Sequence, residues 1–136
     1  MPQTDYILRE IEKIGAMLRM LIRRLVEQKD SEDEEETTEQ TIADFNIEAG
    51  ISLDEILQLK STDFPEYFRN NRGYNTENIE LLADFMAELT KSSATIDKKT
   101  LINKAVGLYK FIDAESKTFS LERAQKISNL LKSLGE

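Results

Sequence analysis

Residues 5–29 read DYILREIEKIGAMLRMLIRRLVEQK, and this stretch decides the fold class of the chain. Its apolar side chains return at alternating steps of four and three residues, which places them on one face of an α-helix. The residues of this seam are Ile7, Ile11, Ile14, Leu18, Leu21 and Leu25. Leu8 and Ile22 widen the seam, and a wide apolar face is typical of a helix in a bundle. The stretch therefore predicts a long N-terminal helix that packs against other helices.

The remaining chain continues the helical pattern. Only five glycines and two prolines interrupt the 136 residues, and no alternating strand pattern of useful length occurs. Residues 41–136 divide into short helices followed by three longer ones. The predicted N-caps are Ser52, Asn75 or Thr76, Asp97 and Ser120. The sequence therefore predicts an all-α protein in which a long N-terminal helix joins a compact multi-helix bundle.

Helix pairs after residue 50 leave repeat-like helical hairpins as an alternative arrangement of this bundle. The likeness to tetratricopeptide hairpins is weak, because the aromatic and glycine spacing of that repeat is missing. Its period of about 34 residues also does not superpose residues 42–75 on residues 76–109. We therefore expect an irregular bundle and keep the repeat as the alternative.

The net charge of −8 is concentrated in one segment. Residues 30–39 hold seven acids and no base, whereas residues 1–29 carry a net charge of +2. The run from residue 30 to residue 40 contains no hydrophobic side chain, so it has nothing to bury and its like charges repel. We therefore expect an N-terminal oligomerisation helix over 1–29, an acidic linker over 30–40 and a helical domain over 41–136.

Several functional classes are excluded by composition. The chain has no histidine, cysteine or tryptophan, which removes thiolate and imidazole metal ligands and the usual nucleophile–base pairs. The five glycines do not form a phosphate-binding spacing. A calcium loop starting at Asp30 would need glycine and glutamate where Glu35 and Thr41 stand. We therefore expect no enzymatic activity, no cofactor and no bound metal, with an enzyme lacking histidine and cysteine as a minor alternative.

The sequence also bears on location and on nucleic acids. The first residues lack a basic signal region, charged residues interrupt the following apolar stretch, and no run of about 18 apolar residues occurs. Outside the acidic run the chain is close to neutral, whereas a phosphate-tracking protein needs a basic stripe. We therefore expect a cytoplasmic protein without a transmembrane segment and without a general nucleic-acid surface.

Five segments together resemble a known family. They are DYILR at 5–9, SLDEIL at 52–57, YN at 74–75, IELLAD at 79–84 and ESKTFSLER at 115–123. In order and spacing they are similar to a family of small all-helical bacterial proteins of unknown function that begin with an Asp-Tyr-Ile-x-Arg helix. The likeness covers nearly the whole chain except the acidic linker. It implies a helical bacterial protein, and it brings no assigned activity and no catalytic residue.

The N-terminal helix carries more apolar surface than one small domain usually covers from one side. We therefore expect a non-enzymatic interaction or scaffold module that forms a dimer or tetramer, with an unidentified protein partner also possible. The predicted oligomer interface is Ile7, Ile11, Ile14, Leu18, Leu21, Ile22 and Leu25. One alternative is that this helix folds back onto its own domain. Another is a peripheral membrane- or nucleic-acid-associated accessory protein that uses the basic residues Arg9, Lys13, Arg19, Arg23 and Arg24.

The segment NNRGYN at 70–75 is the most polar loop of the bundle. Its guanidinium and aromatic ring make Asn71, Arg72 and Tyr74 a candidate recognition loop for a peptide or nucleotide. A purely structural interpretation is that Gly73 ends one helix, Asn75 begins the next, and Tyr74 folds onto the core.

Overall fold

The computed structural model describes residues 2–93 and 95–135, and it confirms the predicted all-α class. Within those ranges there is no β-strand. The helices are α1 (Pro2–Glu27), α2 (Glu34–Glu48), α3 (Leu53–Gln58), the short 3-10 helix η1 (Ser61–Asp63), α4 (Phe64–Asn70), α5 (Thr76–Ser92), α6 (Lys98–Ser116) and α7 (Leu121–Leu134).

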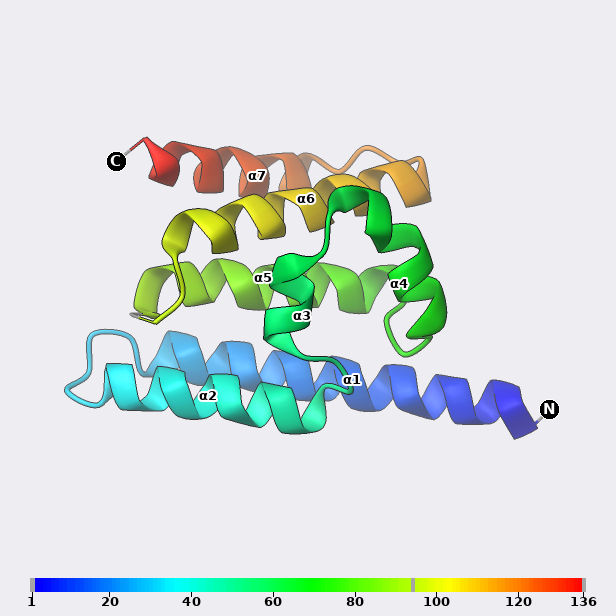
Figure 1. The fold of residues 1–136 in the computed structure, drawn as a ribbon, viewed down its shortest axis with the longest axis horizontal. Helices are drawn as coiled ribbons and strands as arrows, with labels where there is room; N and C mark the ends of the chain where they lie inside the picture. The colour runs from blue at the N-terminus through cyan, green and yellow to red at the C-terminus, as the bar shows by residue number, and fades with distance from the viewer. Residues whose placement is uncertain (1, 94, 136) are drawn as a thin grey trace.

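The four long helices α1, α5, α6 and α7 follow one another across the molecule (Figure 1). Helix α2 lies beside α1, and the short helices α3 and α4 cross the face of the bundle between α2 and α6 (Figure 1). The lengths of successive α-helices are unequal, running from 6 to 26 residues. The result is the irregular compact bundle expected from the sequence, and α6 is enclosed between α5 and α7.

Local sequence signals place the helix starts correctly. The side chains of Ser52, Asn75, Asp97 and Ser120 each accept a hydrogen bond from the backbone N–H three residues later. Such a cap satisfies one of the unpaired donors of the first helical turn, so the side chain and the helix start are linked directly. The predicted N-caps Ser52, Asp97 and Ser120 are therefore confirmed, and of the two candidates for α5 the cap is Asn75.

The apolar seam of α1 lies in the chain's own core, and this corrects the predicted interface. Ile14, Leu18, Leu21 and Leu25 are at most 4% exposed, and α1 packs against α2 and α5 (Figure 1). Phe45 of α2 stacks on Phe85 of α5 with ring centroids 5.0 Å apart, in the same core cluster. Because α2 and α5 together cover the seam, these four residues are not a surface for another protomer in this fold. Helix α1 is therefore folded back onto its own domain, which was the alternative arrangement.

The expected acidic linker over 30–40 is also corrected. Helix α2 already begins at Glu34, so only a short turn over residues 28–33 separates α1 from α2. Acidic side chains in the first turn of α2 face the positive end of the helix dipole, which offsets their mutual repulsion. Thr38 and Thr41 are buried, and their hydroxyls donate to the carbonyl oxygens one turn earlier. In the first turns of α2, which contain no hydrophobic residue, threonine therefore supplies the buried contacts.

Candidate functional site

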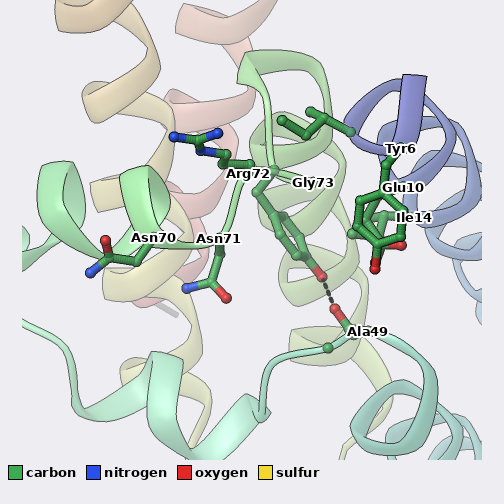
Figure 2. Close-up of a pocket in the computed structure, with 11 residues that line it drawn as sticks. Tyr6, Glu10, Ile14, Ala49, Asn70, Asn71, Arg72 and Gly73 are labelled. Atoms are coloured by element: carbon green, nitrogen blue, oxygen red, sulfur yellow. Dashed lines mark hydrogen bonds between the residues drawn. The ribbon is translucent and has the colours of Figure 1, made fainter. Parts of the chain in front are cut away.

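A cleft of about 710 Å³ lies at the N-terminal end of α1. Its walls are the first turns of α1, the connection from α2 to α3, and the loop from α4 to α5 (Figure 2). The lining residues are Tyr6, Ile7, Glu10, Ile14, Ala49, Gly50 and residues 70–74. Two sets of residues predicted separately thus meet here, since the start of the α1 seam faces the candidate recognition loop.

The α1 wall is the uncovered end of the apolar seam. Helix α1 extends beyond the end of α2 (Figure 1), so α2 cannot cover its first turns. Ile7 stands two helical turns before the buried Ile14 and is only partly buried. Tyr6 is 69% exposed. The result is a half-open apolar wall with an aromatic ring at its edge.

Two glycines shape the cleft. Gly50 has φ +73, a left-handed conformation that lets the chain leave α2 and turn away from α1. Gly73 stands so close to α1 that a Cβ atom there would lie 2.4 Å from Cδ1 of Ile14. Gly50 therefore opens one side of the cleft, and Gly73 allows the loop to approach α1 on the other side.

The loop wall is held in place by buried hydrogen bonds. Tyr74 is 4% exposed, and its hydroxyl donates to the carbonyl oxygen of Ala49 at 2.9 Å (Figure 2). Burial raises the pKa of the Tyr74 phenol, which keeps the proton needed for this bond. Tyr74 thus follows the structural interpretation of the loop, and only its ring contributes to the cleft. Arg72 is exposed and remains available for recognition, whereas Asn71 is half-buried and its side-chain amide donates to the carbonyl oxygen of Tyr67 at 2.8 Å.

Asn78, which the sequence interpretation missed, joins the two walls. Its side-chain amide donates to the carbonyl oxygen of Gly73 at 2.7 Å and to that of Ile11 at 2.9 Å. The side chain is 2% exposed, and a buried amide that makes both bonds fixes the spacing of the groups it connects. The available signal was its position four residues before the buried Leu82, on the apolar face of α5.

Opposite charges stand on opposite walls of the cleft. Glu10 projects from α1, and Arg72 belongs to the loop across from it (Figure 2). Neither residue is in an ion pair of the described structure. The cleft therefore offers an apolar surface with one cation and one anion at its rim. Within residues 2–93 and 95–135, no group of three or more acidic side chains is placed to hold a metal ion.

The remaining predicted interface residues lie elsewhere. Ile11 is half-buried on α1, next to the cleft. Ile22 is half-buried and lines a second cleft, between α5, α6 and α7.

On the basic side of α1, Arg24 pairs with Asp44 of α2 at 2.6 Å. This bond lowers the pKa of Asp44. The other four basic residues are exposed, namely Arg9, Lys13, Arg19 and Arg23.

Comparisons with known proteins add no functional information. The chain matches no protein-family model, no curated protein and no solved structure. The resemblance to a bacterial helical family therefore stays a prediction. No helix in the part of the chain that the structure describes is long and apolar enough to cross a membrane.

Proposed function

We propose that this protein is a non-enzymatic interaction module that self-associates through the cleft at the N-terminal end of α1. One observation carries the proposal: the apolar seam that α2 and α5 cover from Ile14 onward is only partly covered at Ile7 in the cleft, where the exposed Tyr6 ring stands beside it. Burying an aliphatic or aromatic side chain of this size contributes roughly 1.5–3 kcal/mol. A partner that fills the cleft gains this contribution from the exposed Tyr6 and a smaller one from Ile7, which is already partly buried.

The occupant we propose is a second copy of the chain. A two-fold interface places the same surface on both protomers, so it has to be complementary to itself. The cleft meets that requirement because Glu10 and Arg72 lie on opposite walls. In a two-fold dimer each Arg72 faces the partner's Glu10, and each Tyr6 ring lies over the partner's cleft. A dimer is the simplest closed assembly of this kind, and a tetramer requires a second surface.

The proposed module acts in the cytoplasm, since a chain without cysteine is suited to a reducing compartment. A peripheral membrane role has less support. A helix that lies in a membrane interface presents an apolar face to the lipid, but the apolar face of α1 packs on α2 and α5. Only the exposed basic residues would then attract an anionic surface.

The first test compares two neighbouring substitutions by sedimentation velocity at tens of micromolar protein. Ile7→Glu places a charge in the cleft wall and is expected to give a monomer. Leu8→Glu is the matched control, because Leu8 is 52% exposed and is not among the cleft residues. This control is expected to sediment like wild type. A monomeric wild-type protein, or equal dissociation of both variants, contradicts the proposal.

The second test exchanges the two charges. Glu10→Arg alone, or Arg72→Glu alone, places like charges against each other in the dimer and is expected to weaken it. The double variant restores opposite charges and is expected to restore the dimer. Circular dichroism of each variant checks that the helices are intact. Failure of the double variant to restore association argues against this two-fold arrangement.

A further inference from the structure

A second cleft, of about 450 Å³, lies between α5, α6 and α7 on the bundle. Its apolar part is formed by Ile22, Ala87 and Leu130. Its charged part contains three lysines, each from a different helix: Lys91 of α5, Lys98 of α6 and Lys126 of α7. A mostly apolar hollow with a few converging polar groups is the usual form of a small-molecule site.

The two acids of this cleft are already neutralised within the protein. Asp84 accepts hydrogen bonds from the Tyr109 hydroxyl at 2.5 Å and from Lys126 at 3.1 Å. Glu88 pairs with Lys91 at 3.1 Å. Each acid thus has a lysine partner, although Lys126 is shared with Glu80 at 3.0 Å, and neither acid is a vacant site for a cation.

Lys98 is the third lysine of this lining, and its charge is not used among the described residues. It is exposed at the start of α6, and the ion pairs of the described residues do not include it. A neutral donor lies in the same lining: the side-chain oxygen of Asn129 accepts from Gln125 at 3.0 Å, which leaves its N–H groups for another acceptor. Lys98 and Asn129 therefore present free donors at this cleft and one positive charge that is unpaired among the described residues. The Thr90 and Ser133 hydroxyls of the cleft, in contrast, already donate to backbone carbonyl oxygens.

We propose that this cleft binds a small organic anion, specifically a monocarboxylate with a short aliphatic body. The carboxylate lies at Lys98 and Asn129, and the aliphatic body covers Ile22, Ala87 and Leu130. A carboxylate gains a charge-assisted hydrogen bond from Lys98, which is in no ion pair of the described residues. The aliphatic body gains from the removal of apolar surface from water. This proposal does not depend on self-association, because the first cleft is built from other residues.

Four probes separate charge from apolar contact in isothermal titration and amide-resolved NMR titration of the full chain. Octanoate is expected to bind, with shifts at the cleft residues. Acetate has the charge without the body, 1-octanol has the body without the charge, and octylammonium has the opposite charge. Each of these three is expected to bind at least about tenfold more weakly than octanoate. Octylammonium or 1-octanol binding as tightly as octanoate overturns the proposal.

Two variants locate the site. Lys98→Gln is expected to weaken octanoate about five- to tenfold, since it removes one charge-assisted hydrogen bond at a solvated rim. Lys99→Gln is the matched control, because Lys99 is the next exposed lysine of α6 and is not in the lining. Ser133→Trp is expected to abolish binding by filling the cleft. Equal octanoate affinity in Lys98→Gln and Lys99→Gln, or unchanged affinity in Ser133→Trp, refutes the site.

Discussion

Replacing Arg123 with methionine tests how α7 is attached to the bundle. Leu130 is the only fully buried residue among those described in α7, so apolar contact alone holds this helix weakly. Arg123 instead bridges two other helices, with one nitrogen 3.0 Å from Glu80 of α5 and another 2.5 Å from Asp113 of α6. Lys126 adds a second ion pair to Glu80 at 3.0 Å. We infer that these charged contacts supply much of the attachment of α7.

The expected loss follows from the burial of the Arg123 side chain, which is 12% exposed. Exposed ion pairs contribute about 0.2–1 kcal/mol, whereas removal of one partner from a buried pair costs about 3–5 kcal/mol. Arg123 lies between these limits, and its buried Nε atom has no hydrogen-bond partner, which reduces its gain. We therefore expect Arg123→Met to lower the opening free energy of α7 by about 2 kcal/mol. Methionine keeps the length of the side chain.

Native-state hydrogen exchange of the α7 amides measures this opening directly. A loss of about 2 kcal/mol corresponds to exchange about 30-fold faster. The control is Lys91→Met, which removes an ion pair on the surface of α5 whose lysine side chain is 51% exposed. That variant should change α7 exchange less than about twofold. If Arg123→Met leaves α7 exchange unchanged, or if both variants act equally, the ion pairs are not what holds α7.

Three further outcomes are expected. Burial would raise the pKa of Glu80, but hydrogen bonds from its two basic partners in α7 outweigh burial and lower it from the ordinary value of 4.5. Ionised Glu80 therefore stabilises the folded state above pH 4.5, and this contribution is lost as pH falls through the lowered folded-state pKa. The opening free energy of α7, obtained from exchange rates corrected for the intrinsic rate at each pH, should fall from pH 5 towards pH 3 less in Glu80→Gln than in wild type. Gly73→Ala should lower the free energy of unfolding in urea by about 1–3 kcal/mol, because the new Cβ overlaps Ile14. Gly107→Ala, whose Cβ would lie 3.6 Å from its nearest neighbour, should leave this free energy unchanged or raise it by up to about 1 kcal/mol. The opposite order of the two variants would show that the loop can move away from α1. Limited proteolysis should cut first within residues 28–33, and both fragments should stay together because α1 belongs to the core. Separation of the fragments would support the hypothesis of an independent N-terminal helix.

The helix starts were predictable because a cap is a local event, decided by residues three positions apart such as Ser52 and Glu55. The surface on which α1 packs was not predictable in the same way. Its seam shows that something covers Leu18 and Leu21, but not whether that cover comes from the same chain or from another. Phe45 of α2 covers part of it. A short helix containing Phe45 was predicted, but the first turns of α2 were not, because they look like an acidic linker.

The candidate site was predictable in part for the same reason. Arg72 and Asn71 stood out because polar loops are recognisable locally. The opposite wall was not assigned to them, because Ile7 and Glu10 come about 60 residues earlier in the chain. Asn78 decides the spacing of the two walls through bonds to carbonyl oxygens, and such bonds leave no pattern in the side-chain sequence.

The packing of α1 on α5 has a consequence for how the protein is made. During synthesis α1 emerges first, and α5 is complete only about 65 residues later. At roughly 5–20 residues per second, the α5 side of the seam therefore stays unprotected for about 3–13 s on the ribosome. The seven acids that follow α1 emerge within that interval and keep nascent chains apart by charge repulsion, in the manner of gatekeeper residues beside an aggregation-prone segment. The acidic run thus opposes contact between the α1 helices of nascent chains while α5 is still being translated.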